Sequence, residues 1–402
     1  MPANPPKPRE TSVKGLPGSI WALGLVSMFM DTSSEMIHAL LPVFLVTVLG
    51  ANTTMVGLIE GVGEATAAIT KVFSGWLSDY LGKRKALTVL GYGLAAASKP
   101  LFALAPTAGW VLFARFSDRV GKGIRGAPRD ALVGDLSPPD MRGAAYGLRQ
   151  SLDTIGAFIG PLIGLGLMAL LADDFRLVFW LSVVPGVIAV AILISAVKEP
   201  KSACREPAAR SPIVWRELKH LGTAFWIVVA VASILTLARF SEAFLILRAN
   251  QLGLSVTFSP LVLVVMNVVY AISAYPAGTF SDRIGRRGIL GAGFAVLVLG
   301  DIVLGLSASL TTVMLGVALW GLHMGLTQGL LIALVADAAP ERLRGTGFGV
   351  FHLITGIAVL LASLIAGLLW DSIGPATTFF AGALTATAGI IGALAVMRTR
   401  PR

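Results

Sequence analysis

The sequence predicts an all-α integral membrane protein, with twelve transmembrane helices arranged as two six-helix repeats and both termini in the cytoplasm. Three observations lead to this fold class: the composition, the distribution of charge and an internal repeat. Of the 402 residues, 55% are hydrophobic and only 13% are charged, and the mean hydropathy is +0.80. Soluble domains carry roughly 25% charged residues. The composition therefore indicates a membrane protein.

Twelve apolar segments account for most of the chain. A helix needs ~20 predominantly apolar residues to cross ~30 Å of hydrocarbon. We expect spans near residues 18–49, 54–80, 85–105, 108–134, 142–171, 175–197, 221–247, 256–280, 288–308, 311–336, 344–370 and 376–397. The first run is too long, and too polar in its middle, for a cleaved signal peptide. Charged residues within spans are concentrated in the first six.

The longest polar stretch divides the chain into two halves. We expect a tail, a six-helix bundle, a linker, a second six-helix bundle and a second tail, at residues 1–16, 17–198, 199–219, 220–398 and 399–402. The halves share two matches. "GWLSDYLGKRK" aligns with "GTFSDRIGRRG" at an offset of 203 residues, and "ALVGDLSPPDMRGAAYG" aligns with "ALVADAAPERLRGTGFG" at an offset of 202. Duplicated six-helix halves are typical of alternating-access transporters, whose substrate site lies between the halves.

The net charge of +10 is distributed as a topology signal. Lysine and arginine gather near both termini and in alternate connections, which we take to include "GKRK", "GKGIRGAPR", "SDRIGRR" and "ERLRG". The intervening turns, such as "GANTT" and "LADDF", are neutral or acidic. This positive-inside pattern places the termini in the cytoplasm and argues against nucleic acid as a partner. Cys204 is the only cysteine, so neither a disulfide nor a cysteine-based metal site is expected.

The repeated connection resembles motif A of the major facilitator superfamily, G-x-x-x-D-x-x-G-R/K-R/K. The matching residues are Gly75, Asp79, Gly82, Lys83 and Arg84 in the first half and Gly278, Asp282, Gly285, Arg286 and Arg287 in the second. With twelve expected spans and a central linker, the resemblance covers essentially the whole chain. It implies the fold of that superfamily, a secondary transporter rather than an enzyme, and a gating role for these ten residues.

Two further segments are similar to motifs of the same superfamily. "RVGKGIRGA" (119–127) is similar to motif B, although Lys122 and Arg125 replace uncharged positions. "GAFIGPLIGL" (156–165) resembles motif C through Gly156, Gly160, Pro161 and Gly164. Motif C is associated with antiporters, particularly exporters that exchange drugs or other solutes for protons. The resemblance therefore implies a proton-coupled antiporter.

Ionisable residues inside the spans are candidates for function, because each must face a cavity or a partner. Asp31, Glu35 and His38 fall at positions i, i+4 and i+7 of the first helix and so form one stripe. Glu60 and Glu64 share a face of the second helix in the same way. The residues expected to carry protons or cations are Asp31, Glu35, Glu60, Glu64, Asp118 and Asp153, with Asp31 and Glu64 as the principal carriers.

Other polar residues in the spans are expected to bind substrate or to tune the acids. They are His38, Arg119, Arg149, Arg239, Glu242 and Asn267. For Lys71, Lys99, Arg149 and Asp301 we favour a structural role in ion pairs that fix helix packing. For the carboxylates of helices 1 and 2 we favour coupling, because a carboxyl group in a low-dielectric site can take up a proton near neutral pH.

Several functions stay open. The leading hypothesis is alternating-access efflux of a small solute in exchange for protons. The alternatives are proton- or sodium-coupled symport of an organic solute, export of a divalent metal, and an intramembrane enzyme. We expect no cofactor beyond the ion gradient and no resident metal. The expected partners are the solute and the lipid bilayer, and the expected state is a monomer in the inner membrane of a bacterium.

Overall fold

The computed structural model describes residues 15–81, 83–138, 141–198, 215–284, 286–340 and 343–398. Over these ranges the chain is helical and contains no strand. The α-helices are α1 (Gly18–His38), α2 (Leu41–Thr47), α3 (Thr53–Leu81), α4 (Arg84–Ala103), α5 (Ala108–Leu136), α6 (Arg142–Leu170), α7 (Phe175–Leu181), α8 (Val183–Ala196), α9 (Gly222–Ala238), α10 (Ala243–Gln251), α11 (Pro260–Ile284), α12 (Arg286–Leu306), α13 (Leu310–Ala338), α14 (Arg344–Ser372) and α15 (Pro375–Arg398). Two 3₁₀ turns, η3 (Trp215–His220) and η4 (Val256–Phe258), precede α9 and α11.

Parts of the expected organisation lie outside the described residues. These parts are 1–14 of the N-terminal tail, 199–214 of the linker and the tail 399–402. The described helices otherwise follow the expected spans in order. Three spans are each built from two consecutive helices, namely α1 with α2, α7 with α8, and α9 with α10. The breaks after α1 and after α9 are separated by nearly the offset of the sequence repeat, so the two halves interrupt their first span at equivalent places.

Eight of the described helical segments are long and apolar enough to cross a membrane. Helices α1, α3 and α5 are not among them, because charged and other polar side chains lower their hydropathy. Those three helices carry five of the six acids expected to carry protons or cations, namely Asp31, Glu35, Glu60, Glu64 and Asp118, whereas Asp153 lies on α6. The low hydropathy of α1, α3 and α5 is therefore a consequence of the candidate site.

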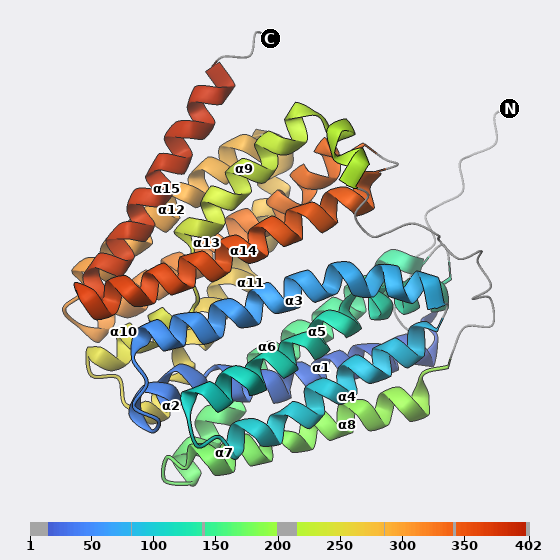
Figure 1. The fold of residues 1–402 in the computed structure, drawn as a ribbon, viewed down its shortest axis with the longest axis horizontal. Coiled ribbons are helices and arrows are strands. Elements are labelled where there is room, and N and C mark those ends of the chain that lie inside the picture. The colour runs from blue at the N-terminus through green and yellow to red at the C-terminus, as the bar shows by residue number, and fades with distance from the viewer. Residues whose placement is uncertain are drawn as a thin grey trace, which may run out of the picture.

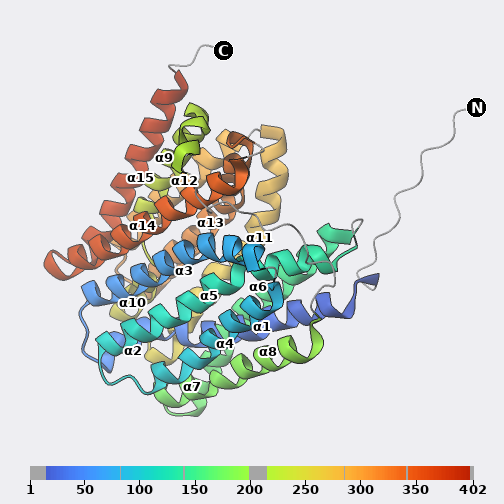
Figure 2. The same ribbon diagram turned by 45° about the vertical axis from the view of Figure 1, so that its right-hand side comes forward.

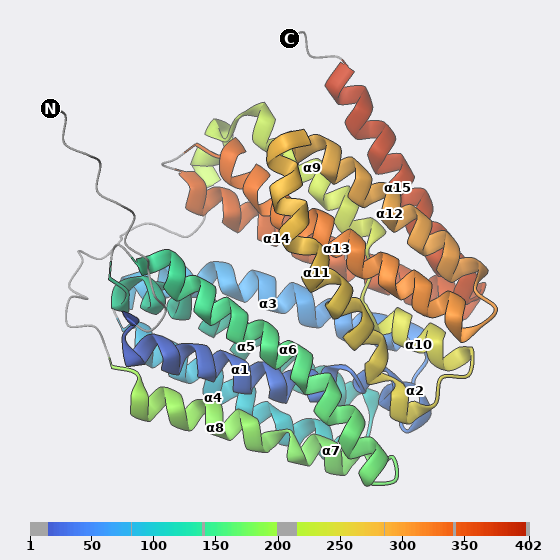
Figure 3. The same ribbon diagram turned by 180° about the vertical axis from the view of Figure 1, so that it is seen from behind.

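The two halves form two helical bundles (Figures 1 and 2). Helices α1–α8 make the first bundle and α9–α15 the second. The bundles meet along two pairs of helices, α3 with α14 and α6 with α11, and Figure 3 shows the second pair from behind. Small residues allow α3 and α14 to approach closely. A Cβ atom at Gly61 would lie 2.9 Å from the Cα of Leu360, and one at Gly367 would lie 2.6 Å from the carbonyl oxygen of Thr53.

The halves share their largest hydrophobic core at one end of the described molecule, the end that holds the turn 48–52 between α2 and α3. We call it the closed end. One buried cluster there joins Phe44 and Phe179 of the first half to Phe244 and Phe379 of the second. Away from this end, one buried cluster draws on the first half and three draw on the second, with Val72 of α3 packed against one of the three. A site between the halves is thus sealed by apolar packing on one side.

Candidate transport site

Helix α5 places a row of basic residues on one face. Arg115, Arg119, Lys122, Arg125 and Arg129 follow one another at spacings of three or four residues, which keeps them on one side of a helix. The side chains of Arg115, Arg119 and Arg125 are buried. Because α5 packs against α3 and contacts α1 and α6, this face meets the acids of all three helices.

The first part of the site is a network around Glu60 near the closed end. His38 lies between two carboxylates, with Nδ1 at 3.1 Å from Glu35 and Nε2 at 3.3 Å from Glu60. Arg115 donates a 2.6 Å hydrogen bond to the same Glu60 oxygen. Glu60 is only 1% exposed. A buried carboxylate needs partners of this kind to offset the loss of hydration.

Deeper along α5, two more acids are paired with bases. Lys99 is 1% exposed, and its ammonium donates hydrogen bonds of 2.7 Å to Asp118 and 2.9 Å to Ser34. Arg119 lies 3.3 Å from Glu64. The Glu64 side chain differs from the others because it is 45% exposed. It therefore faces open space while its charge is held by Arg119.

Asp31 and Asp153 form the third part, where α1 and α6 pack together. Their carboxyl groups interact with each other, and two carboxyl groups this close are favoured when they share one proton. Arg125 lies 3.5 Å from Asp31. Arg129 and Arg149 lie 3.8 Å and 3.7 Å from Asp153. This is the point in the described site where two acids face each other.

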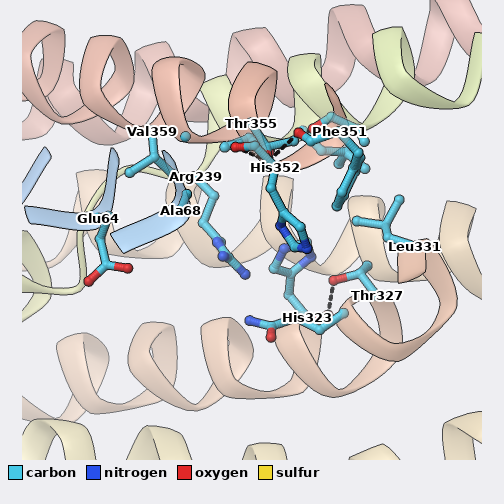
Figure 4. Close-up of a pocket in the computed structure, with 15 residues that line it drawn as sticks. Glu64, Ala68, Arg239, His323, Thr327, Leu331, Phe351, His352, Thr355 and Val359 are labelled. Atoms are coloured by element: carbon cyan, nitrogen blue, oxygen red, sulfur yellow. Dashed lines mark hydrogen bonds between the residues drawn. The ribbon is translucent and has the colours of Figure 1, made fainter. Parts of the chain in front are cut away.

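The second half contributes the opposite wall of a cavity of about 300 Å³. Glu64 and Ala68 line it from α3, and the rest of the lining comes from α9, α13 and α14. In Figure 4, Arg239 lies between Glu64 and the two histidines His323 and His352. His323 is fixed by a 2.8 Å hydrogen bond from its Nδ1 to the carbonyl oxygen of Gly293. The cavity therefore lies between the halves and has ionisable residues on both sides.

A second cavity, of about 670 Å³, lies between α6 and α11. Asp153 and Asn267 line it together with mostly apolar side chains. Glu242, expected at the site, lies at the N-terminus of α10 and lines neither cavity. Within the described ranges, no three histidine, cysteine, aspartate or glutamate side chains come together to hold a metal ion.

Comparison with known proteins identifies the family. The sequence profile of the Major Facilitator Superfamily matches residues 23–266 and 240–402. The chain belongs to this superfamily. An uncharacterised MFS-type transporter of Methanocaldococcus jannaschii is 34% identical over 377 residues, which is 92% of each chain. A gentisate transporter of Corynebacterium glutamicum is 26% identical over 362 residues, 86% of this chain and 79% of the relative.

Solved structures agree on the fold. A bacterial homologue of the human lysosomal transporter Spinster, crystallised in an inward-facing and occupied conformation, superposes with a TM-score of 0.76 at 17% identity, covering 95% of this chain and 96% of the other. The nucleoside transporter NupG gives a TM-score of 0.78 at 11% identity over 94% and 99%. The protein is thus a multi-pass membrane transporter of the major facilitator superfamily and not an enzyme.

The motif A residues of this superfamily member are described only in part. Gly75 faces α5, where an added Cβ atom would lie 3.2 Å from the Cβ of Ala127. Lys83 precedes α4 as its N-cap residue, and Arg84 forms an ion pair with Asp135. Gly82 and Gly285 lie outside the described residues. Asp79, Gly278, Asp282, Arg286 and Arg287 lie in described helices, but the contacts of these five residues are outside the described part of the structure.

Motif C forms the contact between α6 and α1. A Cβ atom at Gly156 would collide with the carbonyl oxygen of Met28, and one at Gly160 would lie 2.8 Å from Cβ of Glu35. Gly164 faces the carbonyl oxygen of Met36, and Pro161 is buried inside the helix. The small residues thus bring α6 against the face of α1 that carries Asp31 and Glu35.

One sequence interpretation is wrong. The charge pattern assigns "GKGIRGAPR" to the basic connections, but the structure places residues 121–129 inside α5. Arg125 and Arg129 consequently pair with Asp31 and Asp153, and Arg129 was absent from the expected site. The signal that could have found it is the spacing of three and four residues that continues from Arg115.

Proposed function

We propose that the protein is a secondary active transporter that couples the movement of a small organic solute to protons by alternating access. The observation that carries this proposal is the contact between the carboxyl groups of Asp31 and Asp153. Their proximity is favourable with one shared proton and repulsive without it. Protonation therefore changes the free energy of the α1–α6 contact, and a ligand that binds one conformation better than another shifts the balance between them.

The glycine face of α6 supports the same proposal. Gly156 and Gly160 leave no room between α6 and α1, so a change in the charge of Asp31 and Asp153 acts on a tightly packed helix contact. Loss of the shared proton would release Asp153 toward Arg129 and Arg149, which already lie within 4 Å. Uptake or release of a proton at this pair would thereby change how α1 and α6 pack against each other.

The direction of transport rests on topology and on motif C. The positive-inside pattern puts both termini in the cytoplasm, which makes the closed end the outer one and leaves the cavity on the cytoplasmic side. The proposed arrangement also has twelve membrane crossings and places the protein in the inner membrane of a bacterium. The resemblance to motif C favours exchange of an exported solute for protons. The relative named as a gentisate transporter supports an organic solute.

The test uses purified protein in proteoliposomes. Gentisate and other radiolabelled organic solutes are screened for accumulation against their gradient when a pH gradient is imposed. We expect accumulation that a protonophore abolishes. Asp31→Asn should lose uphill accumulation yet keep solute exchange between equal concentrations, because the asparagine cannot release a proton. The carboxylate control is Glu242→Gln, outside both cavities. Uphill accumulation by Asp31→Asn at the wild-type rate, or accumulation driven by sodium alone, would contradict the proposal.

A further inference from the structure

The cavity between the halves has more positive charge than its acids can neutralise. Its acidic residue, Glu64, is already held by Arg119 at 3.3 Å and lies 4.0 Å from Arg115. Arg239 lines the same cavity and makes no ion pair within 4.0 Å with any described side chain. The charge on Arg239 is therefore available to a ligand.

Two lysines of the first half lie within electrostatic reach of residues that line this cavity, without lining it themselves. Lys122 is exposed and lies within electrostatic reach of Glu64, Asp31 and Asp153, yet it forms no ion pair with a described residue. Lys71 is exposed as well and lies within electrostatic reach of His352 on the opposite wall. An exposed lysine on a helix that crosses hydrocarbon must face water or a ligand.

The buried arginines show the same imbalance in their hydrogen bonds. Arg115 and Arg119 are 2% and 3% exposed, and the Nε atom of each has no hydrogen-bond partner in the described structure. The same holds for Nε of Arg149. Leaving buried donors unpaired is unfavourable. The described acids therefore satisfy these buried arginine donors only in part, although Oε1 of Glu60 is itself without a hydrogen-bond partner.

We propose that the solute is a small organic anion, bound by Arg239 in the cavity between the halves, where Lys122, within electrostatic reach of the lining residue Glu64, adds positive potential. This inference rests on the proposed function, because it names the substrate class of that same cavity. Arg239 lines the cavity and Lys122 lies within electrostatic reach of its Glu64, so the potential in the cavity favours an anion over a cation. An anion that neutralises these charges would favour the conformation in which the halves close on it.

The first experiment measures the charge of the cavity without a substrate. In a Cys204→Ser background, Gln328→Cys on α13 places a thiol in the cavity lining. Its rate of reaction with anionic sulfonatoethyl methanethiosulfonate is divided by the rate with the cationic trimethylammonioethyl reagent. The same ratio is measured for Ser255→Cys in an exposed turn. We expect the cavity ratio to exceed the reference ratio, and to fall about threefold or more in Arg239→Gln and in Lys122→Gln.

Arg248→Gln is the matched control, because Arg248 donates to the carbonyl oxygens of Leu304 and Ser307 and lines neither cavity. It should leave the ratio unchanged. A cavity thiol that reacts no faster with the anionic reagent than the reference thiol does would overturn the proposal. So would a ratio that Arg239→Gln leaves unaltered.

The second experiment tests binding by thermal stabilisation in detergent. The probes are two matched sets, benzoate with benzyl alcohol and benzylamine, and succinate with 1,4-butanediol and putrescine. We expect at least one anion to raise the unfolding temperature, its neutral and cationic counterparts to fail, and Arg239→Gln to abolish the effect. Stabilisation by a cation, or by neither anion, would overturn the proposal. Both experiments leave proton coupling untouched, so failure of the Asp31→Asn prediction is distinguishable from failure here.

Discussion

Asp371 of α14 accepts a 3.1 Å hydrogen bond from the backbone amide of Thr53, the first residue of α3. Its second oxygen accepts 2.7 Å and 2.6 Å bonds from the amide and hydroxyl of Thr54, and the Thr53 hydroxyl also donates to the Asp371 carboxylate. One half of the protein thus caps a helix of the other half. A carboxylate at a helix N-terminus satisfies free amides and complements the helix dipole.

Replacing Asp371 with alanine should loosen the closed end. Loss of an N-cap costs ~1 kcal/mol, with a range of roughly 0.5–2, which corresponds to a shift between closed and open states of about fivefold at the central value and about thirtyfold at the upper one. Ser363→Cys in a Cys204→Ser background provides the readout, because Ser363 is 0% exposed in the α3–α14 contact. Its labelling by a membrane-impermeant maleimide should become faster in Asp371→Ala.

The control for this prediction is a cap within one half. Ser309 caps α13 through a hydrogen bond from the Thr312 amide, so Ser309→Ala removes a similar interaction without touching the interface. It should lower the unfolding temperature without accelerating the labelling of Ser363→Cys. Equal acceleration by both variants would show that the Asp371 bonds do not hold the halves together.

Lys99→Met should destabilise the protein strongly. The Lys99 ammonium and the Asp118 carboxylate are a buried pair 2.7 Å apart. Removing Lys99 leaves a buried carboxylate with Arg119 at 3.9 Å but without its hydrogen-bonded base, and breaking a buried pair costs about 3–5 kcal/mol. The unfolding temperature in detergent measures the effect. Lys99→Met combined with Asp118→Leu should recover most of the loss, since two apolar residues replace the pair. A double variant as unstable as Lys99→Met alone would contradict a role in pairing.

Gly156→Ala should impair both folding and transport. A methyl group there collides with the backbone of Met28, and forcing extra atoms into a packed contact costs about 1–3 kcal/mol. Gly166 lies on the same helix, and a Cβ atom added there would have no other atom within 4 Å. Gly166→Ala is therefore the matched control and should be neutral or slightly stabilising. Unfolding temperatures and solute exchange in proteoliposomes check both. Similar unfolding temperatures and similar exchange rates for the two variants would contradict the close packing of α6 on α1.

The proton shared by Asp31 and Asp153 should be visible in infrared difference spectra. Between mildly acidic and mildly alkaline pH, the wild-type protein should lose the absorption of a protonated carboxyl group. Asp31→Asn and Asp153→Asn should each remove that difference band, because each leaves a single carboxyl beside an arginine. Glu242→Gln should retain it. A band unchanged in both aspartate variants would place the titrating proton elsewhere.

The stripe of Asp31, Glu35 and His38 was readable from the sequence, because the helical period alone puts those positions on one face. Their partners were not. Glu60 forms ion-pair contacts with both His38 and Arg115. Asp31 lies beside Asp153, which is 122 positions later in the chain. Such distances depend on how helices pack, and the side-chain order along one helix carries no information about them.

The sequence by itself determined the class of protein, since the apolar runs, the repeat and the superfamily motifs follow from composition and order. It also identified most of the charged residues that must be sheltered from hydrocarbon. Only the tertiary structure decided which acids are neutralised and which cations remain available, and it moved "GKGIRGAPR" from a connection into α5. The physical reason is that hydropathy acts on each segment separately, whereas the energy of a buried charge depends on the few ångströms between it and groups on other helices.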